Sequence, residues 1–495
     1  MKSDALIELE RLSRRASDCS IVSPAEAKTG GVDPLGLRQI NFDLMNEVFP
    51  GLNNVARHIR PFTLVAWAWR RTIALASERK ERLRLSAHED FVARIEVAFA
   101  WSLLQRQGTG GIDLPGKQRI AELWGDEKVI RFGDEHWADF VKARRNSTAL
   151  TAAINYGPGL RAFRILVDDA HQPGVRVPGE GTEKLLDAFE KRLTPILDHK
   201  LFNGWGPCSL KRATAEEWAD VWDMDELIAA EREAMCDRLV GEVASRSRRG
   251  GFRLLTRVCE DVEEDELDEE TLRPAMFDLA SNELHEEVVL WRRVQVRQAF
   301  RLALEALFEW IVGQIGGGTL TTEALAQRLL KEVDVEVARA RDWFSSLVER
   351  DATVVSAMAE LQSCMQARQG VGAAALAALA VSVLSPKDLH DRSERRERLP
   401  IALALADVER LGEGSPAHLL AHVIESWIIA QHTYWSVGRG LADARAGGKR
   451  ILRLRLVLEP GGWRVTRGKG APSIPRPTPD RLRSAISLAR EASMI

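Results

Sequence analysis

The sequence contains few cysteines and tyrosines and no complete catalytic or metal-binding signature. Of its 495 residues, 5 are Cys and 2 are Tyr. The cysteines are scattered, odd in number and without a Cys-x-x-Cys spacing, which argues against a thiol-ligated zinc site and a disulfide-stapled scaffold. The expected state of these cysteines is therefore a set of buried free thiols in a reducing compartment.

Long hydrophobic runs are also missing. The first 15 residues are charged and lack the apolar core of a signal peptide. The most apolar run, residues 371–384, is rich in alanine and shorter than the roughly 18 residues that a membrane-spanning helix requires. We therefore predict a cytoplasmic protein without membrane contact, in which this run forms a buried helix.

The composition is typical of a globular protein that is too long for one hydrophobic core. Hydrophobic residues make up 45% of the chain and charged residues 28%. At about 100 to 200 residues per domain, a chain of this length forms roughly three domains. Because apolar residues recur mostly at helical spacing, we predict a mainly α, multi-lobed helical protein with a small C-terminal β-hairpin.

Four segments are predicted along the chain. They are an N-terminal helical domain (1–200), a helical connector ending in an acidic run (201–270), a helical bundle domain (271–438), and a basic β-hairpin with a proline-rich arm and final helix (439–495). The boundary after the connector depends on residues 260–270, of which nine are Asp or Glu. Such a run is typical of a solvated linker or an exposed helix start. A long helix is predicted next, at 281–315.

Residues 50–71 combine turn formers, arginines and tryptophans more densely than any other stretch. Pro50 and Gly51 end one predicted helix, and Pro61 suits the first turn of the next. We therefore expect a fixed connector between two helices, followed by a helix that is buried on several sides.

Two arginines of this connector, Arg57 and Arg60, are candidate contacts for an anion or a protein partner. A guanidinium presents a planar set of donors that matches a phosphate or a carboxylate. The structural alternative is that they pair with acidic residues of a neighbouring element, such as Asp43 or Glu47. The next helix has a predicted capping box, in which Ser86 and Glu89 are three residues apart.

A possible metal site lies on a predicted helix near the end of the bundle domain. His418 and His422 are four residues apart, and Glu425 follows one turn later. Such a set could ligate zinc, which would fit a metal-dependent nuclease or other hydrolase. The His-Glu-x-x-His pattern is absent, and ordinary hydrogen bonds within a helical bundle are the alternative. We therefore assign no metal, no cofactor and no catalytic residue from the sequence, and keep the hydrolase as an alternative.

Positive charge is concentrated at the C-terminus. Residues 439–495 contain thirteen Lys or Arg and four Asp or Glu, a net charge of +9, whereas the whole chain has −3. Alternating leucines at 452–458 and a Pro-Gly turn predict a β-hairpin. Nucleic-acid affinity comes largely from such charge, so DNA contacts are predicted there. The predicted contacts are Lys449, Arg450, Arg453, Arg455, Trp463, Arg464, Arg467 and Lys469. The alternative is docking on an acidic partner, including residues 260–270 of this chain.

Several short motifs resemble those of a known group of proteins. They are Asp33-Pro34-Leu35-Gly36-Leu37, Pro50-Gly51-Leu52-Asn53-Asn54, Arg57-His58-Ile59-Arg60, Trp67-Ala68-Trp69-Arg70 and Thr478-Pro479-Asp480-Arg481-Leu482. Together they resemble an uncharacterised bacterial family from mobile-element and anti-phage defence clusters. The resemblance implies work beside other gene products, such as helicases, ATPases or nucleases, and supplies no catalytic residues.

These observations lead to one expected function and two alternatives. We expect a DNA-associated or scaffolding subunit of a bacterial anti-phage defence system, acting in a complex with other proteins. The alternatives are the metal-dependent nuclease or hydrolase, and a protein-interaction hub that does not bind nucleic acid.

Overall fold

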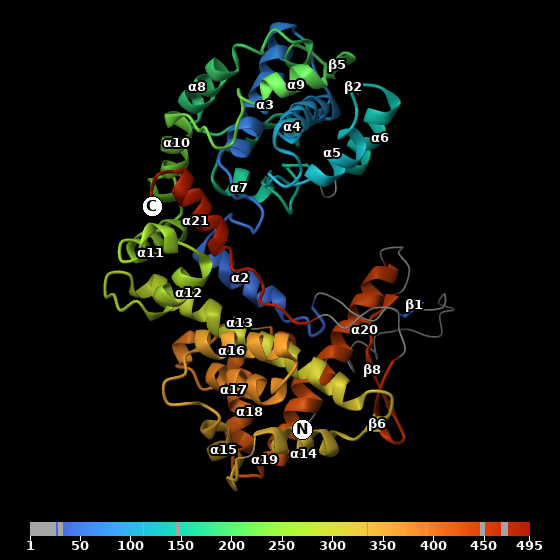
Figure 1. Ribbon diagram of the computed structural model, residues 1–495, viewed down its shortest axis with the longest axis vertical. Coiled ribbons are helices and arrows are strands. Elements are labelled where there is room, and N and C mark those ends of the chain that lie inside the picture. The colour runs from blue at the N-terminus through green and yellow to red at the C-terminus, as the bar shows by residue number, and fades with distance from the viewer. Residues whose placement is uncertain are drawn as a thin grey trace. The chain divides into compact units, whose positions relative to one another are not determined.

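Helices dominate the structure, and the strands form only small sheets (Figure 1). The computed structural model describes residues 26–27, 33–111, 113–144, 149–333, 335–391, 393, 395–445, 451–466 and 474–495. The predicted mainly α fold is confirmed. None of the helices in these ranges is long and apolar enough to cross a membrane.

The chain divides into two compact units. Unit 1 consists of Met1–Met45 and Val288–Thr478, and unit 2 consists of Asn46–Glu287 and Pro479–Ile495. This division differs from the four predicted segments. The acidic run 260–270 lies inside unit 2, and the basic segment 439–495 is shared, with its hairpin in unit 1 and its final helix in unit 2.

Unit 1 is a helical bundle with a small sheet. Its helices are α13 (His285–Ile315, from Val288 onward), α14 (Thr322–Val333), α15 (Ala340–Ser346), α16 (Val354–Ala367), α17 (Val371–Val383), α18 (Ile401–Leu411), α19 (Pro416–His422) and α20 (Ala430–Arg445), with a π-helical segment, Val423–Ile429, between the last two. Two 3₁₀ turns lie at Lys387–Leu389 and Arg396–Arg398. The predicted buried helix at 371–384 corresponds to α17, and the long helix predicted at 281–315 corresponds to α13.

The predicted C-terminal hairpin is confirmed. Strands β8 (Leu456–Glu459) and β9 (Gly462–Val465) pair antiparallel, with Leu458 opposite Trp463. Strand β6 (Thr319–Leu320) adds to the free edge of β9 and completes a three-stranded sheet. Two residues are too few to show strand periodicity, so the sequence did not predict β6. Two further short strands, β1 (Glu26–Ala27) and β7 (Ile451–Leu452), pair in parallel.

A row of buried charged side chains lies along α13. Arg293, Arg297, Arg301 and Glu305 recur every four residues, so they share one face of the helix. Arg297 is fully buried and donates to the carbonyl oxygens of Arg398 and Leu399, each at 2.8 Å. Arg301 donates to Glu305 at 2.7 Å. These guanidinium groups therefore tie loops of unit 1 to its central helix.

Unit 2 consists of short helices and two two-stranded sheets. Its helices are α2 (Arg38–Val48, from Asn46 onward), α3 (Arg60–Glu78), α4 (Leu85–Gln107), α5 (Lys117–Trp124), α6 (Glu135–Arg144), α7 (Gly157–Ala162), α8 (Glu183–Leu193), α9 (Arg212–Trp218), α10 (Ala229–Val240), α11 (Arg246–Cys259), α12 (Glu269–Asp278) and α21 (Leu482–Glu491). The sheets pair β2 (Val129–Phe132) with β5 (Cys208–Lys211) and β3 (Leu166–Asp168) with β4 (Arg176–Pro178). Short 3₁₀ turns lie at Lys200–Phe202 and Glu264–Glu266.

The predicted connector between α2 and α3 is confirmed. Pro61 lies in the first turn of α3, and Gly51 has a φ of +86°, a conformation that favours glycine. A Cβ atom at Gly51 would lie 2.4 Å from the Cβ atom of Ala162, so the chain packs too closely there for any side chain. Trp67, further into α3, is fully buried, as the apolar pattern predicts.

An ion pair between Arg60 and Glu231 lies in the core of unit 2. Both side chains are fully buried, and Nε and Nη2 of Arg60 lie 2.7 and 2.8 Å from the two carboxylate oxygens. Nη2 also donates to the carbonyl oxygen of Glu226 at 2.7 Å, and the guanidinium lies over the ring of Phe189. Glu231 in turn accepts a hydrogen bond from the Ile228 backbone N–H. The pair therefore joins the start of α3 to the start of α10.

Removing one partner of this pair should destabilise unit 2 strongly. We expect Glu231→Ala to lower the free energy of unfolding by about 3–5 kcal/mol, because it leaves a buried guanidinium without its counter-charge. The double variant R60M/E231L should recover most of the lost stability. Recovery is incomplete because the Ile228 backbone N–H still loses its acceptor, Glu231. Urea denaturation followed by circular dichroism measures both effects.

The matched control is Glu233→Ala on the same helix. Glu233 pairs with Lys184 at the surface, where both side chains are exposed. Its loss should change stability by less than about 0.5 kcal/mol. Equal effects of the two single variants would show that the buried pair has no special role.

Candidate functional site

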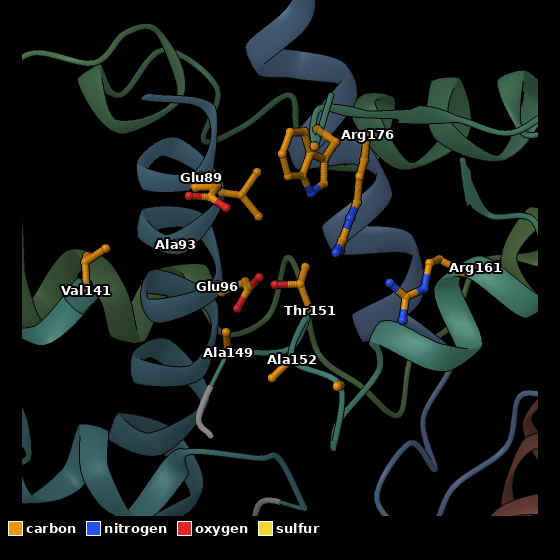
Figure 2. Close-up of a pocket in the computed structure, with 13 residues that line it drawn as sticks. Glu89, Ala93, Glu96, Val141, Ala149, Thr151, Ala152, Arg161 and Arg176 are labelled. Carbon is orange, nitrogen blue, oxygen red and sulfur yellow. The ribbon is translucent and has the colours of Figure 1, made fainter. Parts of the chain in front are cut away.

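A cavity of unit 2 lies between α3, α4, α6, α7 and β4, with a volume of about 340 Å³ (Figure 2). Residues 149–153, which precede α7, close part of its wall. The cavity is polar: charged side chains of both signs line it, together with the hydroxyl of Thr151 and the indole of Trp69. A cavity of this size is within the range of small-molecule sites.

One wall of the cavity carries two carboxylates. Glu89, Val92, Ala93 and Glu96 follow the i, i+3, i+4, i+7 spacing, so α4 presents them on a single face. The side chain of Glu96 is only 2% exposed, and its Oε2 accepts a hydrogen bond from the Leu150 backbone N–H at 2.9 Å. This bond fixes the loop before α7 against α4.

The opposite wall carries two arginines. Figure 2 shows Arg161 of α7 and Arg176 of β4 reaching into the cavity. Arg161 is exposed and Arg176 is half-buried, and the buried Nη1 atom of Arg176 has no hydrogen-bond partner among the described residues. Burial and the nearby charge of Arg161 lower the pKa of Arg176 below the ordinary value for arginine, against the opposing effect of Asp168, Glu89 and Glu96.

The indole of Trp69 supplies a further donor at the cavity. Trp69 is 3% exposed and stacks on His88, with an interplanar angle of 21°. Its buried Nε1 atom has no hydrogen-bond partner within the described part of the chain. The apolar pattern of α3 predicts that this tryptophan is buried, but it does not reveal that the indole lines a cavity.

The predicted capping box at Ser86 and Glu89 is wrong. Helix α4 begins at Leu85, its N-cap residue is Arg84, and no side chain caps it. Glu89 therefore lies inside the helix, where it lines the cavity. The signal that points to this site in the sequence is a pair of carboxylates seven residues apart on an otherwise apolar helix face.

The two connector arginines have different surroundings. Arg60 is fully buried in its pair with Glu231, so an external anion would have to displace that carboxylate. Arg57 lies nearer the surface, where its Nη1 is 3.0 Å from Oδ2 of Asp113. Neither pairs with Asp43 or Glu47, the acidic residues considered from the sequence; the actual partners come from distant parts of the chain.

His58, between these arginines, binds the last turn of α21. Its Nδ1 lies 2.6 Å from Oε1 of Glu491, and the Ile59 backbone N–H donates to Oε2 of the same carboxylate, also at 2.6 Å. Glu491 therefore places a negative charge at the N-terminus of α3, where the helix dipole favours one. Burial by itself lowers the pKa of His58, but the bond to Glu491 outweighs it and raises the pKa above 6.5.

Helix α21 also lies against the acidic run. It packs on α10, α11 and α12 (Figure 1), and Nη2 of Arg490 donates to the carbonyl oxygens of Glu264 and Leu267. Arg273 of α12 binds Asp480 at 2.6 Å just before the helix. The bonds from Arg490 reach main-chain oxygens, so the carboxylates of the run are not its acceptors there.

The predicted nucleic-acid contacts are only partly described, and those that are described differ in exposure. Arg455 is 7% exposed and forms an ion pair with Glu309 of α13. Trp463 donates from Nε1 to the hydroxyl of Thr322 at 3.0 Å. Arg464 is 41% exposed and lies 3.2 Å from Glu459 across the hairpin, and Arg453 is half-buried. Lys449, Arg450, Arg467 and Lys469 lie outside the described residues.

The histidine set of the hydrolase alternative does not converge on one point. His422 lies 2.9 Å from Asp407 of α18, whereas His418 and Glu425 are more exposed. Hydrogen bonds from His422, Arg410 and Trp427 hold the pKa of Asp407 below its ordinary value despite its burial. Glu425 lies in the π-helical segment, where a spacing of seven residues no longer returns to the same face. Within the described ranges, no group of three or more His, Cys, Asp or Glu residues could hold a metal ion.

No family model, curated protein or solved structure matches this chain. The fold and the sites define a mainly α-helical protein of two units, one of which contains a polar cavity lined by two arginines and two carboxylates.

The pairing of His58 with Glu491 predicts a pH dependence of stability. Because the pKa of His58 is raised in the folded state, the pair's contribution to the free energy of unfolding is fully present below pH 6.5. It is lost as the pH rises through the raised pKa. The stability difference between the protein and a His58→Gln variant should therefore shrink from pH 6 to pH 9. Urea denaturation at several pH values measures it.

Comparing the two proteins at each pH removes the contributions of the other histidines. His432, for example, has a pKa of about 4 because it is buried, so its effect has the opposite sign. A difference between H58Q and the unsubstituted protein that stays constant over this range would contradict the charged pair.

Proposed function

We propose that the protein is a DNA-associated or scaffolding subunit of a bacterial defence complex. The observation that carries the DNA half of the proposal is the net charge of +9 on residues 439–495 in a chain of net charge −3. Lys and Arg side chains that neutralise phosphates release counterions, which favours binding regardless of base sequence.

The burial of individual side chains reduces the number of residues that we propose as DNA contacts. Arg455 is engaged with Glu309 inside unit 1, so we leave it out of the proposed contact set. Arg464 and Arg453 remain candidates on the hairpin, and Arg476 is exposed on the arm that follows it. Lys449 and Arg450 precede the hairpin in the sequence, and Arg467 and Lys469 follow it, so four more charges adjoin it along the chain.

The scaffolding half of the proposal is supported by the motifs that resemble a family from defence clusters. Its partners would be the products of adjacent genes, with a helicase, an ATPase or a nuclease as the expected kinds. Arg490 of the final helix binds the carbonyl oxygens of Glu264 and Leu267, so this helix packs within unit 2. The hairpin and the arm are therefore the part of the basic segment that would contact a partner.

Filter binding to duplex DNA at rising salt tests the DNA half. The variant K449Q/R450Q/R467Q/K469Q should bind more weakly at all sequences. Its slope of log affinity against log salt should fall by roughly one for each phosphate that the protein no longer neutralises. This variant is preferable to deletion of residues 439–495, because deletion also removes α21 from unit 2.

The matched control is R119Q/R131Q/R246Q/R253Q, which removes the same charge from exposed positions of unit 2. It should bind DNA nearly as well as the unsubstituted protein. Absence of binding even at low salt, or an equal drop in affinity in the two variants, would reject a specific role for the hairpin. Co-purification with adjacent gene products and no retained nucleic acid would then leave a protein-interaction hub.

A further inference from the structure

The cavity of unit 2 contains donors without acceptors. The buried Nη1 of Arg176 and the buried Nε1 of Trp69 have no hydrogen-bond partner among the described residues. A buried donor that is left unsatisfied destabilises the fold, and a charged donor does so more strongly. Arg60, elsewhere in the unit, receives acceptors at Nε and Nη2, although its buried Nη1 has none among the described residues. The donors of Arg176 and Trp69 differ in lying at a cavity, where a bound molecule would supply their acceptors.

The two arginines define the charge of that group. Arg161 and Arg176 come from α7 and β4, both point into the cavity, and neither forms an ion pair with a described carboxylate (Figure 2). The positive charges of Arg161 and Arg176 repel each other, whereas the charges of Asp168, Glu89 and Glu96 attract Arg176. An oxyanion between them would remove the repulsion, and guanidinium groups bind phosphates and carboxylates through parallel hydrogen bonds.

The carboxylates of α4 restrict the rest of the ligand. Glu89 and Glu96 line the wall across from the arginines, so a molecule that is negative throughout would be repelled on that side. Ionised carboxylates accept hydrogen bonds and cannot donate them. The portion of the ligand near Glu89 and Glu96 must therefore carry donors, such as hydroxyl groups.

The cavity volume limits the size of the ligand. At about 30 Å³ per water molecule, 340 Å³ corresponds to roughly ten waters. This is enough room for a sugar-sized molecule with one charged group. A polymer such as DNA does not fit, so the cavity is independent of the basic hairpin.

We propose that this cavity binds a small polyhydroxylated oxyanion, whose phosphate or carboxylate is held by Arg161 and Arg176 and whose hydroxyl groups face Glu89 and Glu96. The indole N–H of Trp69 supplies a further donor to the ligand. Sugar phosphates and sugar acids share this chemistry. The described residues that line the cavity all belong to unit 2.

Isothermal titration calorimetry on the full chain tests the site with four probes: ribose 5-phosphate, gluconate, inorganic phosphate and ribose. Ribose 5-phosphate or gluconate should bind best, and which of the two binds more tightly identifies the oxyanion. Inorganic phosphate should bind at least tenfold more weakly, because it lacks the hydroxyl groups that face the carboxylates. Ribose should not bind measurably, because it lacks the anion.

Two double variants distinguish binding at this site from nonspecific attraction of the anion to surface arginines. R161Q/R176Q should weaken binding of the best probe at least tenfold, whereas R119Q/R131Q, which removes the same charge from the surface of unit 2, should leave it unchanged. Circular dichroism melting should show that both variants fold. Equal binding by both double variants, equal binding of ribose, or no binding of either polyhydroxylated anion would overturn the proposal.

A second variant tests the carboxylate wall. Glu89→Gln removes one negative charge and keeps the size of the side chain. Inorganic phosphate should bind more tightly to E89Q, because repulsion is reduced, and the preference for ribose 5-phosphate over inorganic phosphate should fall. An unchanged preference would overturn the role of Glu89. Failure of DNA binding would not affect these results, because the two sites share no residues.

Discussion

Both units depend on the same requirement: a guanidinium that leaves water must receive acceptors. In unit 2, Nε and Nη2 of Arg60 meet it through Glu231 and the carbonyl oxygen of Glu226, which joins residues far apart in the chain. In unit 1, Arg297 of α13 meets it with two main-chain carbonyl oxygens. Each bond restricts a loop that could otherwise move away from the core. Charged residues thus help to specify which segments meet, and apolar burial supplies most of the driving force.

The cavity of unit 2 is one of the places where buried donors lack hydrogen-bond partners within the described chain. Arg176 and Trp69 have buried donors without acceptors, beside a second arginine and opposite two carboxylates. Natural proteins rarely leave such groups unsatisfied, and the exceptions call for a functional explanation. The buried donors of Arg176 and Trp69 differ from that of Arg60 in lying at a cavity. Binding of a ligand there would supply acceptors to these donors.

The basic C-terminal segment illustrates how net charge and accessible charge differ. Its +9 is a property of the sequence, but the fold divides it between units and engages some of its members. Arg455 neutralises Glu309, and Arg490 caps main-chain oxygens near the acidic run. The exposed remainder on the hairpin and arm is what a polyanion would meet. A count of charges alone overestimates the binding surface, because it does not separate the arginines that stabilise the fold from those that face solvent.

Several features follow from the sequence alone: the helical class, the long helix that became α13, the connector before α3 and the β8–β9 hairpin. These features depend on local periodicity and on the backbone limits of proline and glycine, which act over a few residues. Long-range packing, by contrast, pairs Arg60 with Glu231, adds β6 to the hairpin and places Glu89 in a cavity opposite Arg161 and Arg176. Such pairings join residues that are distant along the chain, and neither spacing nor composition records which distant segments pack together.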